Sequence, residues 1–453
     1  MHCSATTSSN PGPLRGCLDR CRSVHQRTGV VYCRKKRRKP MNRIATISSL
    51  IMVMTLAAGG RGGDCPRFRG PAGDGTFSEA GLLKTWPQGG PKMVWSAKGL
   101  GQGYSSAVIA NDTVYTTGMD EQRQGHLFAY ALDGALKWKT PYGPELEKRG
   151  PSVAGTRATP TIDGNRVFLM TGFGKLITFD AVQGQVLRTV DLVERFGPKQ
   201  AQFGFAESVL VEGQKVICAP GGTDASLVAL DKTTGATLWQ TKGLSQPTGY
   251  CPARPIEHHG RRLILTMLAQ GAVAVEADTG AVVWQHDYPH RAGVQPNPPL
   301  YREGMVYLSS GMGAGGAMLA LTDAGPGAAP KWTDKTLDCQ MQGTVLIDGY
   351  IYGTAQSGNR GLVCLQWQTG KVMWNAPVVG MGVVVAADGM LYIYAQNGTM
   401  HLVKPNPETF EPVSQFAVSE GTDEHWAHPT IAHGRLYIRR GDVVMAYDVR
   451  AGS

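Results

Sequence analysis

Several polar and aromatic side chains stand a few residues ahead of short aliphatic stretches, where a fold could gather them into one site. Glu207 is a carboxylate that could take a proton or bind a metal ion. Arginine side chains could hold anionic oxygens, and Trp426 offers a flat face for stacking. Glu207 is therefore the candidate catalytic base. The candidate binding residues are Tyr104, Arg157, Tyr250, Arg254, Gln340, Gln342, Trp426 and His428.

A repeated hairpin in the chain indicates the fold that would bring these residues together. Residues 227–239, 272–284 and 362–374 each read as four apolar residues, a Thr-Gly corner and a second short strand that ends in Trp. Glycine can adopt the positive φ that such a corner needs, which favours a β-hairpin. One Trp per hairpin predicts a side chain that docks between neighbouring units. The tryptophans in this position are Trp95, Trp138, Trp239, Trp284, Trp332 and Trp374.

A second repeated phrase, a Gly-containing turn followed by an aliphatic-aromatic strand, precedes each hairpin. It occurs eight times, at intervals of 40 to 53 residues. Four antiparallel strands in each ~45 residues make the unit of a β-propeller. The 59 glycines among 453 residues agree with so many turns. We predict an all-β, eight-bladed β-propeller, with seven blades as the alternative number and two stacked β-sandwiches as the alternative fold.

The two ends of the repeat region complement each other. Residues 91–95 form a Trp-ending strand with no strands before it, whereas the last repeat, at residues 443–448, lacks such a strand. The N-terminal strand is therefore predicted to complete the last blade and remove the open edges of the ring. Because the innermost strand opens each blade, the candidate residues are expected around a central channel. The alternative that we favour is that they pair with one another across a wet channel.

The excess positive charge is confined to the start of the chain. The first 60 residues hold 11 Lys and Arg against one acidic residue, and the rest of the chain holds 34 basic and 34 acidic residues. A body that binds nucleic acid would carry a basic face of its own. Nucleic acid is therefore not an expected partner.

The N-terminal region carries the pattern of a secretory signal peptide. A positive start at Arg43 precedes about 15 apolar residues and a small-residue exit, and the stretch is short for a membrane span. Asp64 next to Cys65 argues against a lipid anchor. We expect a periplasmic or extracellular protein that is not an integral membrane protein. The predicted organisation is a disordered or misassigned extension at 1–40, a signal peptide at 41–61, a lead-in segment at 62–90 and the propeller at 91–449.

The phrase acid–x–x–Thr-Gly–x–x–x–Trp, as in residues 231–239, resembles the repeat of the pyrroloquinoline-quinone (PQQ) enzymes, which are eight-bladed propellers. Residues 65–75, 81–87, 103–106 and 426–429 also look like exported PQQ-like propeller proteins of planctomycete-type bacteria. The same type of propeller occurs in the outer-membrane assembly scaffold lipoprotein, which has no cofactor, and in quinoprotein alcohol dehydrogenases. The resemblance therefore implies the fold and leaves the chemistry open.

For a quinoprotein, the resemblance would imply PQQ with Ca²⁺, Glu207 as the base or calcium ligand, Arg157 near the quinone oxygens and Trp426 stacking on the ring. The chain lacks the adjacent cysteine pair of the family's alcohol dehydrogenases and the Cys-x-x-Cys-His motif of a c-type haem. His258-His259 is not an expected metal pair, because adjacent residues of an extended chain point to opposite faces. We expect no metal site and favour the absence of a cofactor.

Two functions remain open from the sequence. The favoured one is an exported, non-catalytic scaffold that binds a protein, peptide or glycan on a propeller face or in the channel. The alternative is a PQQ- and calcium-dependent dehydrogenase of alcohols, polymeric alcohols or sugars. Near-minimal blades, missing cofactor machinery and a neutral body favour the scaffold.

Overall fold

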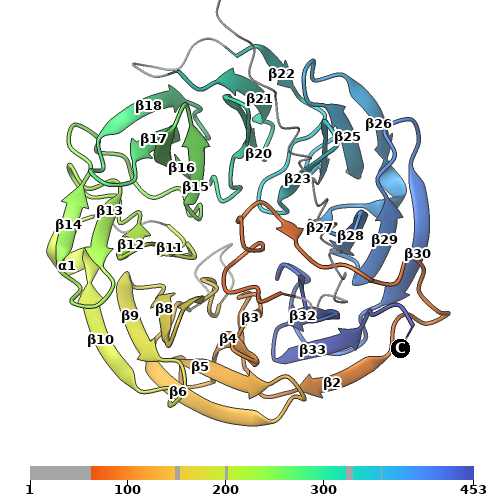
Figure 1. Ribbon diagram of the computed structural model, residues 1–453, viewed down its shortest axis with the longest axis horizontal. Coiled ribbons are helices and arrows are strands. Elements are labelled where there is room, and N and C mark those ends of the chain that lie inside the picture. Colours follow the sequence, from red (N-terminus) through yellow and green to blue (C-terminus); the bar gives the residue numbers. More distant parts are fainter. Residues whose placement is uncertain (1–62, 148–153, 199–201, 323–329, 359, 453) are drawn as a thin grey trace, which may run out of the picture. The chain divides into compact units, whose positions relative to one another are not determined.

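Four-stranded antiparallel sheets, one for each repeat, are arranged around a common axis (Figure 1). The computed structural model describes residues 63–147, 154–198, 202–322, 330–358 and 360–452, so the predicted extension at 1–40 and signal peptide at 41–61 lie outside it. Eight such sheets form, each with its first strand near the axis and its fourth at the rim. The predicted eight-bladed β-propeller is confirmed, and the alternative of seven blades is wrong.

The first four blades follow one another along the chain, each from axis to rim. Blade 1 is β3 (Val108–Ala110), β4 (Thr113–Met119), β5 (Gln124–Ala131) and β6 (Leu136–Pro144). Blade 2 is β7 (Thr161–Asp163), β8 (Arg166–Met170), β9 (Lys175–Asp180) and β10 (Val186–Asp191), followed by helix α1 (Leu192–Phe196). Blade 3 is β11 (Leu210–Glu212), β12 (Lys215–Cys218), β13 (Val228–Asp231) and β14 (Thr237–Gln240). Blade 4 is β15 (Arg254–His258), β16 (Arg261–Leu268), β17 (Gly271–Glu276) and β18 (Val282–Asp287).

The remaining blades repeat this order. Blade 5 is β19 (Leu300–Arg302), β20 (Met305–Ser310), β21 (Gly315–Ala320) and β22 (Trp332–Asp334). Blade 6 is β23 (Thr344–Ile347), β24 (Tyr350–Thr354), β25 (Leu362–Gln366) and β26 (Val372–Ala376), followed by the short 3-10 helix η1 (Pro377–Val379). Blade 7 is β27 (Gly382–Ala387), β28 (Met390–Ala395), β29 (Thr399–Lys404) and β30 (Glu411–Ala417). Blade 8 is β31 (Thr430–Ala432), β32 (Arg435–Arg440), β33 (Val443–Asp448) and, at the rim, β2 (Met93–Ala97).

The ring closes where the two ends of the repeat region meet. β2 pairs antiparallel with β33, so a strand from the start of the ring supplies the fourth strand of its last blade, as the sequence predicts. Strand β1 (Thr76–Phe77) lies at the axis instead and pairs in parallel with β27. The segment around β1 crosses the centre of the ring (Figure 1).

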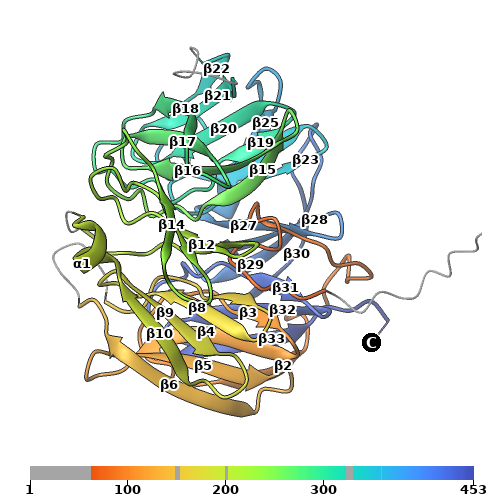
Figure 2. The ribbon, with the colours of Figure 1, turned by 60° about the vertical axis from the view of Figure 1, so that its left-hand side comes forward.

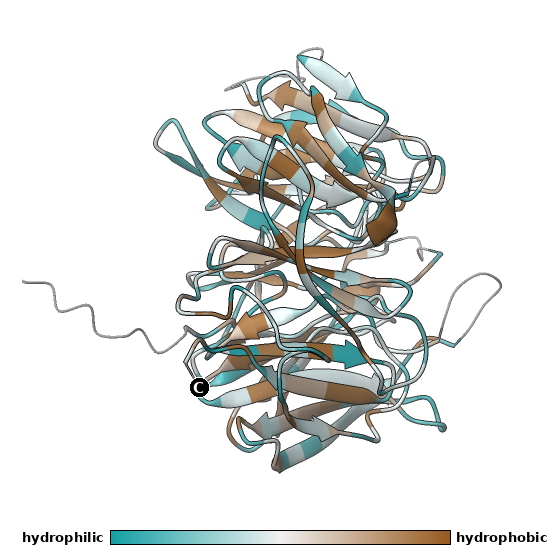
Figure 3. Ribbon diagram, turned by 90° about the vertical axis from the view of Figure 1, so that its right-hand side faces the viewer, coloured by the Kyte–Doolittle hydropathy of each residue, from teal (hydrophilic) through white to brown (hydrophobic). Residues whose placement is uncertain are grey.

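The blades are held together by apolar strands and are irregular at their outer edges. Figure 3, coloured by hydropathy, shows that the apolar residues are concentrated within the sheets and that the loops are mostly polar. In seven blades the register shifts between the third and fourth strands. Such bulges twist an edge strand and discourage pairing with another chain. The fourth strand of each of these blades is therefore an edge strand that does not readily pair with another chain. Strand β6, at the lower edge of Figure 2, is an example.

Four of the repeated tryptophans lie against the glycine corner of the next blade: Trp95, Trp138, Trp239 and Trp332. A Cβ placed on Gly280 would lie 2.3 Å from the Trp239 ring, and one on Gly370 would lie 2.4 Å from the Trp332 ring. Both glycines have φ near +70°, so the corner needs glycine for its backbone and for the space that the indole occupies. Four of the repeated indoles donate Nε1–H to a backbone oxygen of the next blade: Trp95 to Leu132 (2.7 Å), Trp239 to Ala277 (3.1 Å), Trp332 to Trp367 (3.2 Å) and Trp374 to Asn406 (2.8 Å).

Candidate functional site

The central channel is crossed by part of the lead-in segment, residues 65–77, which we call the plug. Its backbone is tied to the first strands of several blades. Cys65 forms a bridge with Ile109 of blade 1, and the Pro66 carbonyl accepts a hydrogen bond from the Ile162 N–H of blade 2 (2.8 Å). At its other end β1 extends the sheet of blade 7. The plug therefore spans the channel from one side of the ring to the other.

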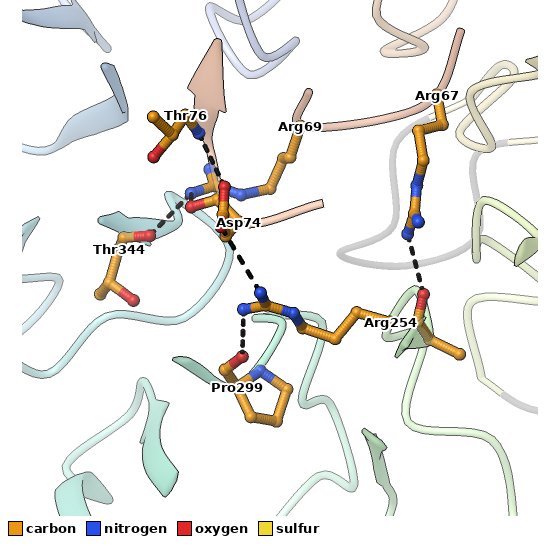
Figure 4. Close-up of polar contacts among 8 residues, drawn as sticks. Arg67, Arg69, Asp74, Thr76, Arg254, Pro299 and Thr344 are labelled. Carbon is orange, nitrogen blue, oxygen red and sulfur yellow. Dashed lines mark hydrogen bonds and ion pairs between the residues drawn. The ribbon is translucent and has the colours of Figure 1, made fainter. Parts of the chain in front are cut away.

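Arg69 fastens the middle of the plug. It is 3% exposed and donates to the backbone oxygens of Thr344 (2.8 Å) and Val384 (3.2 Å) and to Nδ1 of His428 (3.0 Å), which joins blades 6, 7 and 8. The guanidinium also fills space left by a glycine, because a Cβ on Gly343 would lie 1.8 Å from Nη1 of Arg69. Figure 4 shows Arg69 extending towards Thr344 beside Asp74.

Two more arginines, the partly buried Arg67 and the buried Arg254, complete the plug region (Figure 4). Arg67 donates to the Ala253 carbonyl (3.0 Å), and Arg254 donates to the Pro299 carbonyl (3.1 Å) and lies 3.4 Å from the Asp74 carboxylate. Burial lowers the pKa of Arg67 and of Arg69 to about 10, and burial also lowers the pKa of Arg254. All three stay charged at neutral pH. Asp74 is the one carboxylate that contacts this group among the described residues, so the plug region carries net positive charge.

A pocket of about 600 Å³ lies on the axis, next to the plug. It is formed mainly by the loops that lead into the first strand of each blade, and Phe68 of the plug belongs to its wall. We call it the axial pocket. Its lining consists of Phe68, Tyr104, Arg157, Gln202, Phe203, Ala206, Ser208, Tyr250, Pro252, Ala292, Val294, Pro296, Asn297, Pro298, Met312, Gln340, Met341, Gln356, Met381, Gln396, Trp426 and His428.

The two halves of the axial pocket differ in chemistry. Aromatic pairs lie on the side of blades 8, 1, 3 and 4: the ring centroids of Tyr104 and Trp426 are 5.2 Å apart, and those of Phe203 and Tyr250 are 6.0 Å apart. Methionine and glutamine side chains line the side of blades 5 to 7. Aromatic faces give a ligand a rigid apolar surface, whereas methionine adapts to its shape.

His428 lines the axial pocket but has no nitrogen left for catalysis. An arginine can only donate, so Nδ1 accepts from Arg69 and Nε2–H donates to the Met341 carbonyl (2.9 Å). Burial and the adjacent guanidinium hold the pKa of His428 well below its usual value, which keeps the ring neutral. The ring also packs against Phe68, with centroids 4.6 Å apart. His428 is therefore a structural link between the plug and the pocket wall.

Glu207, the candidate base, is buried outside the lining of the axial pocket. It is 2% exposed, and its Oε1 accepts the Ala219 N–H at 2.7 Å. Burial raises the pKa of Glu207 to about 8, so the carboxyl is mostly protonated at neutral pH. A second buried carboxyl, Glu145, accepts from the Tyr142 hydroxyl (2.9 Å) and the Gly172 N–H (3.1 Å), and burial raises its pKa to about 7.

The structure brings most of the candidate binding residues together. Those that line the axial pocket are Tyr104, Arg157, Tyr250, Gln340, Trp426 and His428. Arg254 lies in the plug region instead, and Gln342 uses its Oε1 to accept the backbone N–H groups of Gln340 (3.0 Å) and Met341 (3.1 Å). The favoured expectation that these groups pair with one another across a wet channel needs correction. Arg254 and His428 pair with the lead-in segment, because that segment crosses the channel.

Other lining residues were not expected from the sequence. Phe68 comes from the lead-in segment, which carries no repeat to place it. Gln356 and Gln396 follow the second strands of blades 6 and 7 and stand in matching Ala-Gln pairs, 355–356 and 395–396. That repeated pair is the signal that could have shown that the loops after the second strands also contribute to the pocket.

The lining does not fit a calcium-bound quinone. Calcium takes oxygen ligands that include carboxylates, but no Asp or Glu belongs to the described lining, and Arg157 contributes positive charge to it. Within the described ranges no group of three or more His, Cys, Asp or Glu side chains could hold a metal ion. His258 and His259 stack on each other at 4.0 Å, and Nδ1 of His258 lies 3.1 Å from the Tyr301 hydroxyl.

The five cysteines of the described residues are unpaired and buried: Cys65, Cys218, Cys251, Cys339 and Cys364. Burial raises the pKa of Cys65 and of Cys251 to about 12, so these thiols are poor nucleophiles. Over the part of the chain that the structure describes, no helix has the length and hydrophobicity needed to cross a membrane.

Fold and site together define an eight-bladed β-propeller of PQQ-like repeats whose channel is crossed by its own lead-in segment. The family model described as outer membrane protein assembly factor BamB matches residues 84–187 and 123–376, about two thirds of the chain. The chain therefore belongs to this family. No curated protein matches the sequence.

Solved structures of two kinds share the fold. BamB from Moraxella catarrhalis is 19% identical with a TM-score of 0.56, over 80% of this chain and 98% of that one. Quinohemoprotein alcohol dehydrogenase from Comamonas testosteroni is 13% identical with a TM-score of 0.62, over 88% of this chain and 82% of that one. A europium-containing methanol dehydrogenase is 14% identical with a TM-score of 0.59, over 81% and 87%. At such identities the likeness concerns the fold alone.

Proposed function

We propose that this chain is an exported, non-catalytic β-propeller that binds a partner of protein, peptide or glycan nature through the axial pocket and the face around it. The observation that carries the proposal is the chemistry of the lining. Its histidine uses both ring nitrogens within the protein, and no carboxylate belongs to its described residues. A pocket of this kind can bind and orient a ligand, but it offers no general acid–base pair.

Export rests on residues 41–61, with their positive start and apolar stretch. The balanced charge of residues 61–453 argues against nucleic acid as the partner.

The experiment that tests the proposal is a calorimetric titration of PQQ with Ca²⁺ into the purified chain, followed by dye-linked turnover assays with alcohols and sugars. We expect no binding heat and no turnover from a folded, β-rich protein. Binding of about one PQQ per chain at micromolar affinity or tighter, with turnover of any alcohol or sugar, would overturn the proposal.

The second candidate is a PQQ- and calcium-dependent dehydrogenase of alcohols, polymeric alcohols or sugars. A specific observation favours it: Glu207 is a buried carboxyl with a strongly raised pKa, as catalytic carboxyls often are. Glu207→Ala provides the test. If turnover is found, this candidate predicts that the substitution abolishes it at unchanged folding, and unaltered turnover removes Glu207 as the base.

A further inference from the structure

The plug borders the axial pocket through Phe68, so a ligand that enters from the side away from the plug meets the plug along its path. Contacts of the plug reach first strands on opposite sides of the ring, from Ile162 in blade 2 to Thr344 in blade 6, and Phe68 forms part of the pocket wall. A polymer fits such a pocket by one of its ends more readily than by an internal loop, which needs room for two passes of the chain.

The lining has the composition of the core of a protein–protein interface. Interface cores are enriched in Tyr, Trp, Phe, Met and Arg and are depleted in Lys, Glu and Asp. The described lining holds five aromatic residues, three methionines and one arginine, and none of its members is Lys, Glu or Asp. The five aromatic residues are Phe68, Tyr104, Phe203, Tyr250 and Trp426. This composition is compatible with a polypeptide ligand, whose backbone the glutamine and asparagine side chains of the same lining could bind.

The charge around the axial pocket favours an anionic group on that ligand. Arg157 is the charged member of the described lining, and the three guanidinium groups of the plug region face one carboxylate, Asp74. The nearby buried carboxyls, Glu145 and Glu207, have raised pKa values of about 7 and about 8, so they offset this charge only in part. Asp423 and Glu424, next to Trp426 along the chain, are exposed to water, which screens them.

Arg157 stands in a setting suited to a carboxylate. Burial lowers the pKa of Arg157, and the nearby Glu145, Tyr104 and Tyr250, in that order, act in the opposite direction. The Tyr250 hydroxyl accepts the Phe203 N–H (3.3 Å), so its hydrogen can be donated to a ligand. A guanidinium beside a tyrosine hydroxyl offers charge-assisted hydrogen bonds to a carboxylate.

We propose that the axial pocket binds the carboxy-terminal end of a partner polypeptide. The last side chains of the partner, apolar or aromatic, lie between the aromatic pairs and the methionines, and its terminal carboxylate is held by Arg157. The inference rests on the proposed binding function and specifies the ligand class of the same site.

The test uses the full chain and a fluorescent hexapeptide, GSGSLF, made as a free carboxylate and as a carboxamide. We expect the carboxylate form to bind at least tenfold tighter by fluorescence anisotropy, because a charge-assisted hydrogen bond contributes about 1.5–3 kcal/mol. Arg157→Gln should abolish this difference between the two forms. Arg302→Gln, which removes an exposed arginine of blade 5, is the matched control and should leave it unchanged.

Equal binding of the two peptide forms to the unaltered chain overturns the inference, and that comparison needs no variant to fold. Equally tight binding of the longer amidated peptide GSGSLFGSGS also overturns it, because in that peptide the Leu-Phe pair is internal and no terminal carboxylate follows it. Either result, with no PQQ bound and no turnover, leaves the proposed binding function standing. PQQ binding with turnover removes both proposals.

Discussion

The rim and the axis of this propeller are built in opposite ways. At the rim, a Trp of one blade packs on a glycine corner of the next, and this contact recurs at four interfaces, those of Trp95, Trp138, Trp239 and Trp332. At the axis, one non-repeated segment makes a different contact with each blade that it reaches. Repetition at the rim is suited to stability, since several interfaces solve the same packing problem. Between blades 2 and 3, Arg188 and Val190 take the place of the indole against Gly235. The axis breaks the symmetry and supplies the one place with individual chemistry.

This comparison predicts that rim substitutions lower stability without changing binding, whereas axis substitutions change both. The largest expected effect is at the rim. Trp284→Ala removes a fully buried indole (0% exposed) between blades 4 and 5, and we expect a loss of about 3–5 kcal/mol in the free energy of unfolding. Urea denaturation followed by tryptophan fluorescence and circular dichroism measures it. A loss below about 1 kcal/mol would mean that the rim does not carry the stability.

The next effect concerns Glu207, near the axis. Its pKa is about 8 in the fold against an ordinary 4.5, so between these pH values the unfolded chain binds fewer protons than the folded chain. The free energy of unfolding should therefore fall as pH rises through this window, by up to about 1.4 kcal/mol per pH unit from this group. The glutamine in Glu207→Gln cannot ionise. The free energy of unfolding of this variant, relative to that of the unaltered protein, should therefore increase as pH rises from 5 to 8. Parallel stability curves for the two proteins would contradict this.

Alanine substitutions of two glycines, one at the axis and one with open space around it, compare the effect of packing at the two places on the free energy of unfolding. Gly343→Ala would place a Cβ 1.8 Å from the Arg69 guanidinium, whereas Gly349→Ala, at a similar positive φ (+83° against +76°), meets no atom within 4 Å. Both carry the backbone cost of about 1–2 kcal/mol, so we expect Gly343→Ala to be lower in unfolding free energy by about 1–3 kcal/mol. It should also loosen the plug, seen as faster hydrogen exchange at residues 65–77. Equal losses in the two variants would mean that Arg69 is not fixed in place.

The smallest expected effect is again at the rim. Trp374→Phe removes the hydrogen bond to the Asn406 carbonyl (2.8 Å) at a partly exposed indole, and keeps an aromatic ring in place. We expect a loss of about 1 kcal/mol and no change in peptide binding. Thermal unfolding and the anisotropy assay, applied to the same preparation, provide the two readings. Weakened binding in this variant would show that rim and axis are coupled.

Local sequence was enough to predict the rim. The Thr-Gly corner, the alternating apolar strand and the closing Trp are all short-range patterns, and their period gave the number of blades. The prediction that β2 completes blade 8 needed only the missing strand at one end and the extra strand at the other. Six of the eight candidate binding residues line the axial pocket, because each stands ahead of a first strand and such positions face the axis.

What the sequence could not determine is the path of the lead-in segment. Arg67 and Arg69 stand in a glycine-rich stretch without a repeat pattern, and only the closed ring creates the backbone oxygens that receive them. The contact between Arg69 and His428 joins residues 359 positions apart, and no local pattern specifies such a pairing.

The sequence by itself determined the repeat, the eight blades and the closure of the ring, because each depends on hydrogen-bonding and packing patterns within one or two neighbouring hairpins. The tertiary structure alone decided that the lead-in segment crosses the channel, that Arg254 and His428 contact that segment, and that the axial pocket combines aromatic side chains with Arg157. These features arise where segments distant in the chain meet at one axis. Burial there decides which partner each polar group finds.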